Sequence, residues 1–231
     1  MLRDGLLDRL LNMLRADPTV DGVALVGSFG RGTADAWSDI DLLILMADQD
    51  IPGFVSQPGD RPWGRAPRVK DARHNAPAGA AQVNATFVLS GLPFWVDFNV
   101  YPASRTGWTT DSKVIFERRE IPASGVSYEE LASSEPRHPP QPVTRDEIRM
   151  RNLALVPIAA KYVARGSAQD ACGLIRMLGD DPHYLAASQD SQLAALRAIT
   201  DSLSDPAWLW LAQAVTAFLD LAESTISRGR S

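Results

Sequence analysis

Cysteine is almost absent from this chain of 231 residues, since Cys172 is the only one. A single cysteine excludes an internal disulfide framework and any zinc site built from several cysteines. Long uninterrupted apolar runs are missing too, because the most apolar stretch, residues 208–221, contains Gln213 and Asp220. A bilayer span needs about 20 apolar residues. We therefore expect a buried helix in this stretch and no membrane partner.

Positive charge is also scarce. The chain has 23 Lys and Arg against 28 Asp and Glu, which gives a net charge of −5 and a pI near 5.2. Binding along a nucleic-acid backbone needs clustered Lys and Arg, so we expect no nucleic-acid partner. A small acceptor suits an acidic chain better, and the net negative charge is compatible with a cationic one. Residues 2–16 carry charges among their leucines, which favours an amphipathic helix over a secretory signal and hence a soluble, cytoplasmic protein.

The most informative segment is the GSFGRG of residues 27–32, which follows an apolar run and precedes Asp39 and Asp41. Residues two apart on a strand share a face, so we expect the two carboxylates to lie side by side. At about 4 Å, two such charges repel by roughly 1 kcal/mol in water and roughly 4 kcal/mol near a protein surface. A divalent cation reverses that sign, and Mg²⁺ favours one or two carboxylates plus phosphate oxygens. The pattern predicts a metal-dependent phosphate site.

The glycines of this segment permit close backbone approach, and N–H groups of a turn that enters a helix can bind a polyphosphate. Ser28 adds a hydroxyl. Gly-Ser-x-Gly alone is usually just a turn. The acidic pair is harder to explain structurally, because buried charges are paired, metal-bound or neutralised, and residues 40–46 contain no basic side chain.

Residues 27–41 contain, in order, Gly27-Ser28, Arg31-Gly32 and Ser38 with Asp39-x-Asp41. This pattern resembles the signature of the nucleotidyltransferase superfamily with the DNA polymerase beta-like fold. The similarity extends over residues 23–46, and the pattern is that of small aminoglycoside nucleotidyltransferases and of minimal nucleotidyltransferases. The resemblance implies a third carboxylate on a later strand.

The candidate for this third carboxylate is Asp97, which lies in the aromatic, strand-forming run of residues 93–101. Asp111 is the competing candidate.

The resemblance also implies two Mg²⁺ ions and ATP or another NTP as co-substrate. Asp39 and Asp41 would hold both ions, and Asp97 would complete the ion on the attacking side and take the hydroxyl proton. The nucleotide-binding residues would be Gly27, Ser28, Arg31 and Lys161. For the two basic residues of this set, the alternative is an ordinary solvated side chain on a helix.

The first half of the chain alternates helical and strand patterns. After the helix at 2–16 and a short helix at the glycine-rich turn, the expected strands are residues 20–26, 39–46, 83–89, 94–101 and 113–117. The last of these would lie at the sheet edge. The composition of residues 90–93 predicts a hairpin turn. Residues 48–79 are rich in proline and glycine and read as loop with room for one short helix.

The second half is helical. Residues 121–143 are proline-rich and are interpreted as a linker, after which Thr144 and Glu147 form a capping-box pattern. One helix is expected to begin at this capping box and continue to residue 166. Three more are expected over residues 168–178, 189–203 and 206–227. Such helices with short loops favour an antiparallel bundle. We predict an α+β protein with a small mixed-sheet nucleotidyltransferase domain at 1–120, a linker at 121–143 and a helical bundle at 144–231, as a monomer or homodimer.

Two further parts of the site are open. The acceptor base in similar enzymes is sometimes a glutamate of the second domain, and Asp146 and Glu147 are the nearest candidates, although both are also favoured in a first helical turn. Aromatic side chains could line an acceptor pocket or belong to the core. They are Trp63, Trp95, Trp108 and Tyr101.

Three function classes follow. The first is transfer of a nucleoside monophosphate, AMP from ATP, to a hydroxyl of a small antibiotic-like or sugar-like acceptor with release of pyrophosphate, as in antibiotic resistance. The second is a protein-modifying (AMPylating) minimal nucleotidyltransferase of a toxin-antitoxin type system. Arg176 and His183 loosely resemble the Arg-His motif of HEPN ribonuclease bundles, but residues 179–182 would break that helix. The third, a non-catalytic nucleotide-binding relative, is disfavoured because the three carboxylates are present.

Overall fold

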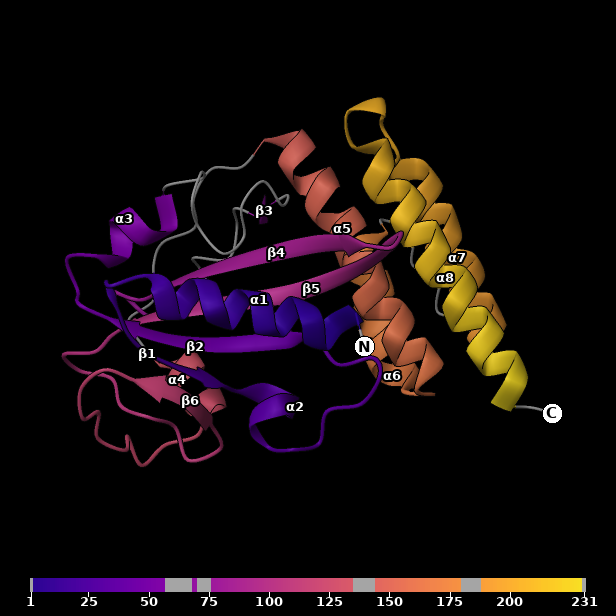
Figure 1. Cartoon of the computed structure of the whole chain (residues 1–231). Coiled ribbons are helices and arrows are strands. Elements are labelled where there is room, and N and C mark those ends of the chain that lie inside the picture. The colour runs from indigo at the N-terminus through magenta and orange to yellow at the C-terminus, as the bar shows by residue number, and fades with distance from the viewer. Residues whose placement is uncertain (1, 57–67, 70–75, 135–143, 180–187, 230–231) are drawn as a thin grey trace. The chain divides into compact units, whose positions relative to one another are not determined.

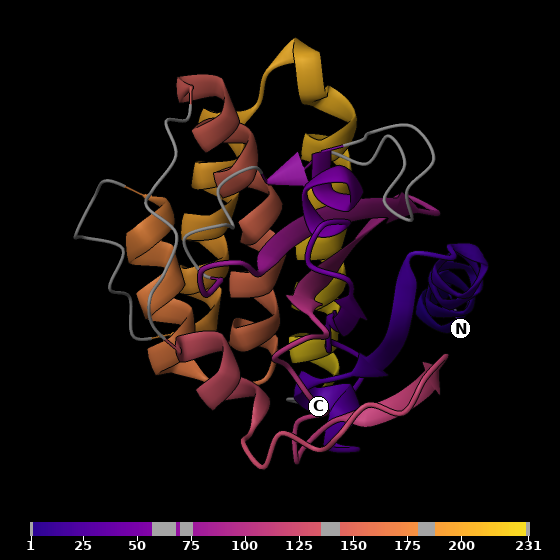
Figure 2. The same cartoon turned by 90° about the vertical axis from the view of Figure 1, so that its left-hand side faces the viewer.

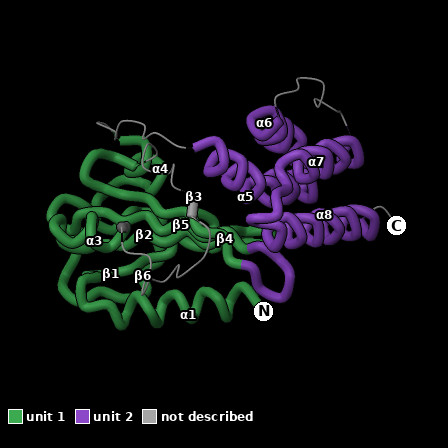
Figure 3. The backbone as a smooth tube through the Cα atoms, turned by 90° about the horizontal axis from the view of Figure 1, so that it is seen from above, with its two compact units in different colours: residues 1–87, 94–143 green, residues 88–93, 144–231 purple. Residues whose placement is uncertain are grey.

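The computed structural model describes residues 2–56, 68–69, 76–134, 144–179 and 188–229. The chain divides into two compact units (Figure 3). Unit 1 comprises Met1–Phe87 and Phe94–Val143, and unit 2 comprises Val88–Pro93 and Thr144–Ser231. A mixed sheet followed by C-terminal helices confirms the expected α+β class (Figure 1).

Unit 1 is built on a six-stranded sheet with the order β3-β4-β5-β2-β1-β6. The strands are β1 (Val20–Leu25), β2 (Ile40–Met46), β3 (Arg68–Val69), β4 (Ala81–Leu89), β5 (Leu92–Pro102) and β6 (Lys113–Glu117). β2 runs parallel to β5 and antiparallel to β1, which is itself antiparallel to β6. The sheet is therefore mixed, and β6 occupies the edge expected for it.

One face of this sheet is covered by α1 (Leu2–Ala16), which packs against β1. Its buried residues Leu6, Leu10 and Leu14 recur every four positions and form one apolar stripe. Figure 2 shows α1 on one side of the sheet and the short helix α4 (Tyr128–Ser133) on the other. Because both faces are covered, the central strand β2 is apolar at nearly every position and not strictly alternating.

The β4–β5 hairpin turns at Ser90 and Gly91, as the sequence predicts. Both residues have positive φ, 50° and 78°. Two consecutive positive φ angles characterise the type I′ turn, whose twist matches that of paired strands. The turn returns the chain along β5, the strand that carries Asp97 and pairs with β2.

Unit 2 contains the helices α5 (Arg145–Ala164), α6 (Ala168–Leu178), α7 (Gln189–Leu203) and α8 (Leu209–Gly229). Helix α5 packs against each of the other three. Its start is fixed by the expected capping box, in which the Thr144 hydroxyl accepts from the Glu147 N–H and the Glu147 carboxylate accepts from the Thr144 N–H. Asp205 caps the 3₁₀ turn Pro206–Trp208 that leads into α8.

The segment interpreted as a linker, 121–143, has more structure than its proline content suggests. Ala123 pairs with Trp108 in an isolated bridge, and residues 128–133 form α4 in unit 1. Ser127 and Glu130 form a capping box at its start, a four-residue pattern that the prolines around it obscured. Residues 135–143 lie outside the described residues. Across the described ranges, no helix combines the length and apolar character needed to cross a membrane.

Candidate active site

The glycine-rich segment leaves β1 directly and forms the four-residue helix α2 (Gly27–Gly30). Its entry is fixed to the neighbouring strand, because Val26 N donates to Asp41 O at 3.0 Å. Gly27 has a φ of +60°, and a Cβ placed on it would lie 2.5 Å from Asp41 Oδ2. Only glycine allows the backbone to come this close to that carboxylate.

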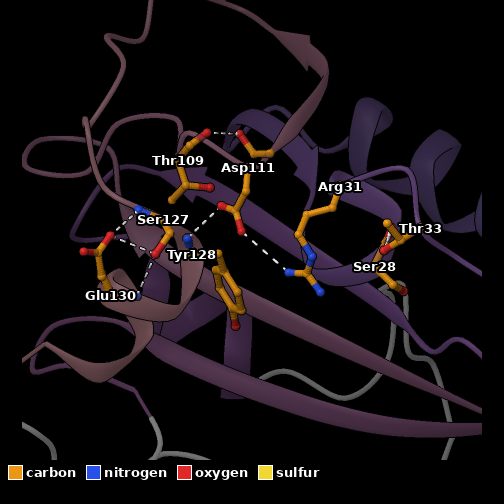
Figure 4. Close-up of polar contacts among 9 residues, drawn as sticks. Ser28, Arg31, Thr33, Thr109, Asp111, Ser127, Tyr128 and Glu130 are labelled. Carbon is orange, nitrogen blue, oxygen red and sulfur yellow. Dashed lines mark hydrogen bonds and ion pairs between the residues drawn. The ribbon is translucent and has the colours of Figure 1, made fainter.

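The same segment is closed at its far end. Gly30 N donates to Val26 O, and Thr33 N donates to Ser28 O at 2.9 Å (Figure 4). The first N–H groups of a helix have no intrahelical partner, so they are left as donors for an anion. The loop thereby presents backbone N–H groups and the partly exposed Ser28 beside the carboxylate of Asp41.

The predicted carboxylates lie at the start of β2 and within β5. Asp41 and Asp97 are register partners of the parallel pair β2 and β5. Register partners on adjacent strands point to the same face, so the two carboxylates project together. Asp39 is the residue immediately before β2, which places it at the entry to the strand and not inside it. Residues that are far apart in the sequence are thus brought together by strand pairing.

Asp97 is held by two side-chain donors. Asn84 Nδ2 and Trp95 Nε1 both donate to Asp97 Oδ1, the indole at 2.7 Å. Trp95, expected in an acceptor pocket or the core, therefore orients a carboxylate. Asn84, on β4, was not recognised from the sequence, because no local pattern links it to a residue on the next strand.

Burial raises the pKa of Asp97 well above its ordinary value, and the charge of Asp41 raises it further. The hydrogen bond from Asn84 lowers the pKa, and Asp39 raises it again. The charges of both other carboxylates therefore act on Asp97, and the raised pKa favours its protonated form in the absence of a cation.

The candidate metal ligands of the site are the carboxylates of Asp39, Asp41 and Asp97. In the part of the chain that the structure describes, no cluster of three or more His, Cys, Asp or Glu has side chains arranged to hold an ion. The chemistry of the donors nevertheless fits Mg²⁺, which prefers carboxylate oxygens and keeps several other ligands from substrate and water. The negative charges of Asp41 and Asp39 repel that of Asp97, and a divalent cation bound between them would remove this repulsion.

Asp111, the competing third carboxylate, has a different position. It accepts a hydrogen bond from Tyr128 N at 2.8 Å, at the start of α4, and its Oδ2 lies 3.7 Å from Arg31 Nη1 (Figure 4). A Cβ on Gly30 would overlap the main-chain oxygen of Asp111. Asp111 thus connects the end of α2 with the start of α4. Arg31 was expected to bind phosphate. In the structure it pairs with Asp111, and the Arg31 side chain is 53% exposed.

Tyr128 is a residue of this region that the sequence interpretation missed. Its ring packs against the core cluster that contains Tyr101 and Leu43, on the sheet face of Asp41. Burial raises the pKa of the Tyr128 hydroxyl, followed by the effects of Tyr101, Asp97 and Asp41. The hydroxyl is therefore within electrostatic range of the carboxylates. The Ser127–Glu130 capping box is the signal that would have located it.

The remaining predicted residues have other surroundings. Lys161 is a buried residue of α5 in unit 2, with Nζ 5.7 Å from the Tyr162 ring centre, and its role toward a nucleotide stays a prediction. Trp108 is a core residue whose Nε1 donates to Glu117, and Tyr101 is also in the core. Trp63 and His183 lie outside the described residues.

Glu147, one of the two candidate acceptor bases, uses its carboxylate in the cap of α5. Asp146 lies beside it in the first turn of the same helix. Both residues belong to unit 2, so a role for either in proton transfer stays a prediction.

Residues 7–58 match the model of a family described as nucleotidyltransferase domain. This match supports membership of the nucleotidyltransferase superfamily. The matched range includes α2, Asp39 and Asp41 and ends before Asp97 and Asp111. A comparison with curated proteins gives no match. The domain match supports transfer of nucleotidyl groups, and it confirms the resemblance noted from residues 27–41 at the level of the superfamily.

Proposed function

We propose that this nucleotidyltransferase uses Mg²⁺ and moves a nucleoside monophosphate, AMP from ATP, to a hydroxyl of a small antibiotic-like or sugar-like acceptor, releasing pyrophosphate. The observation that carries the proposal is the pairing of Asp41 with Asp97 across β2 and β5, next to the Gly27 backbone. A polyphosphate site and a carboxylate pair are the two parts that this reaction needs side by side.

The chain's own residues take distinct parts in the proposed reaction. The N–H groups of α2 and the Ser28 hydroxyl bind the β and γ phosphates, since N–H groups at a helix start attract anions. Asp39, Asp41 and Asp97 supply the carboxylates that hold two Mg²⁺ ions. Mg²⁺ held by these carboxylates would lower the pKa of the attacking hydroxyl and neutralise charge on the pyrophosphate.

Asp97 is the proton acceptor in this proposal. Burial raises the pKa of the Asp97 carboxyl, which makes the carboxylate a stronger base than that of an ordinary aspartate. Asn84 and Trp95 both donate to Oδ1 and so fix the orientation of the carboxylate. A base held in one orientation transfers a proton more effectively than a mobile one, because the reacting geometry is prepared in advance.

The acceptor is proposed to be small and cationic on the ground of net charge. The chain carries −5, which disfavours a polyanionic acceptor and favours a polyamine-like one through long-range attraction. An AMPylated protein is the other acceptor class, and the experiment below includes it as a separate outcome.

The test is pyrophosphate release with Mg²⁺ and each of the four NTPs, against a panel of aminoglycosides, lincosamides, sugars and a cell lysate. Release that requires a small hydroxyl compound supports the proposal, and mass spectrometry of that compound identifies the adduct. Label from α-labelled ATP on a lysate protein supports the AMPylating alternative instead. No release under any condition, with Asp41→Asn as the blank, contradicts both.

A further inference from the structure

The connection between α2 and β2 leads directly into Asp39 and is folded on itself. The Asp35 carboxylate accepts from Trp37 N at 3.0 Å and from Ser38 Oγ at 2.8 Å, while Asp35 N donates to Ser38 Oγ at 3.0 Å. These bonds make a compact turn whose last residue, Ser38, is buried. The conformation of this turn fixes the direction in which the chain enters Asp39.

Arg3, in the first turn of α1, contacts this turn from outside it. Its Nη1 donates to Asp35 O and, at 3.2 Å, to Ser38 O. The Ser38 carbonyl belongs to the planar peptide group that also contains the Asp39 nitrogen. By binding that carbonyl, the guanidinium restricts the rotation of the peptide on which the Asp39 side chain depends.

The same guanidinium also contacts the glycine-rich segment. Arg3 Cζ lies 4.8 Å from the centre of the Phe29 ring, within the range of a cation–π interaction. Phe29 belongs to α2, whose first residues lie against Asp41. One side chain therefore joins the helix proposed to bind phosphate to the residue before the first carboxylate.

The environment of Arg3 is that of a structural contact and not of a solvated surface residue. Its side chain is only 15% exposed, and Nε lies 3.9 Å from Asp4 Oδ1. A planar guanidinium can stack on a ring while it donates in its own plane, which a lysine ammonium cannot reproduce. Arg3 also precedes the range that matches the family, residues 7–58, so the match assigns it no role.

We propose that Arg3 is a positioning residue that locks Phe29 of α2 to the Ser38–Asp39 peptide, and so sets the spacing between the phosphate-binding segment and the metal-binding carboxylates. The proposal rests on the proposed function of these two elements. It predicts that loss of Arg3 loosens residues 31–39 and weakens productive use of the metal–nucleotide complex, while the rest of unit 1 stays folded.

The experiment compares Arg3→Ala and Arg3→Lys with Arg9→Ala, a matched control because Arg9 is an exposed residue of the same helix. Amide hydrogen exchange of the metal-free and nucleotide-free protein is the first measurement. The proposal expects faster exchange over residues 31–39 in both Arg3 variants and wild-type exchange there in Arg9→Ala. Wild-type exchange over 31–39 in Arg3→Ala, or equally faster exchange throughout unit 1, overturns it.

The second measurement is the Mg²⁺ concentration that gives half-maximal pyrophosphate release at fixed ATP and acceptor. Loss of groups that orient metal ligands typically costs about 10- to 100-fold in metal affinity or activity, and we expect Arg3→Ala in that range with Arg3→Lys close to it. An unchanged Mg²⁺ requirement overturns the proposal. If the wild-type protein shows no turnover, the proposed function fails, whereas the exchange measurement still decides whether Arg3 holds the turn.

Discussion

The two faces of the unit 1 sheet differ although the same strands form them. On β2, Leu42 and Ile44 alternate with Asp41, Leu43 and Leu45, so neighbouring residues point to opposite faces. The face of Leu42 and Ile44 is wholly buried on the side where α1 packs, whereas the other face carries Asp41 and then a core cluster that α4 contacts. One face contributes mainly stability, and the other combines stability with the carboxylates.

This arrangement shows why the register of β2 matters for function. The side-chain period of a strand is two, so a shift by one residue would exchange the contents of the two faces. The buried side chains of Ile40 and Leu42, on either side of Asp41 in the strand, therefore hold its carboxylate beside Asp97. The four substitutions below separate what each face contributes.

Asp41→Asn removes the charge that faces both Gly27 and Asp97. We expect turnover to fall by at least about 100-fold, because loss of a proposed metal ligand should exceed the effect of losing groups that merely orient ligands. The melting temperature should stay the same or rise, since a like charge next to Asp97 disappears. Steady-state kinetics and thermal melts measure both. Asp8→Asn, an exposed aspartate of α1, is the control, and retention of wild-type turnover in Asp41→Asn would remove the acidic pair from the mechanism.

Leu10→Ala addresses the opposite face. Leu10 is 1% exposed in the apolar stripe of α1, and truncation of a buried leucine costs about 2–5 kcal/mol through lost contacts and the cavity left behind. Urea denaturation should show this loss in the free energy of unfolding. The folded fraction should keep the wild-type KM for ATP. A large rise in KM without a loss of stability would contradict the division of roles between the faces.

Gly27→Ala places a methyl group against the carboxylate face. The φ of +60° costs about 1–2 kcal/mol for a residue with a Cβ, and the new Cβ would also meet Asp41 Oδ2 at 2.5 Å. Gly32→Ala is the matched control, because Gly32 has a φ of +70° but open space around it. Both variants should lose stability in denaturant titrations. Only Gly27→Ala should also lose turnover, and equal kinetics in the two variants would argue against a close approach of loop and carboxylate.

Asp97→Asn should stabilise the metal-free protein at neutral pH. The raised pKa means that the folded state binds the Asp97 proton more tightly than the unfolded state, whose pKa is about 3.9, so wild-type stability falls as the pH rises from there through the folded pKa. Asparagine avoids this loss and keeps an oxygen for Asn84 and Trp95. Thermal melts should show a gain of about 2–4 °C for each kcal/mol recovered.

The pH dependence supplies the control for this last comparison. The difference in melting temperature between Asp97→Asn and wild type should shrink as the pH falls, and it should be smallest below the unfolded-state pKa of about 3.9, where the wild-type carboxyl is protonated in both states. A difference that stays constant with pH would mean that the charge of Asp97 does not destabilise the folded state.

Much of the fold was predictable because its signals are local. The α1 stripe, the Ser90–Gly91 turn and the Thr144 cap each depend on residues within a few positions of one another. Helix α4 shows the limit of composition as a guide, since the prolines around it suggested a linker and a four-residue capping box at Ser127 decided the structure.

The candidate site was only partly predictable for the same reason. The sequence favoured Asp97 as the third carboxylate, because it lies in an apolar and aromatic run, but it left Asp111 as a competing candidate. Strand pairing placed Asp97 next to Asp41. Asp111 instead accepts a hydrogen bond at the start of α4 and pairs with Arg31. Arg3 had no local signal at all, since its partners lie on a different element.

The sequence by itself determined the glycine-rich loop and the spacing of Asp39 and Asp41, because backbone sterics and the two-residue strand period act within a few positions. Tertiary structure decided that Asp97 lies beside Asp41, which donors orient its carboxylate, and which arginine contacts the entry to Asp39. Those choices depend on contacts between residues distant in the chain, and such contacts are set by strand register and helix packing, which leave no mark in any short stretch of sequence.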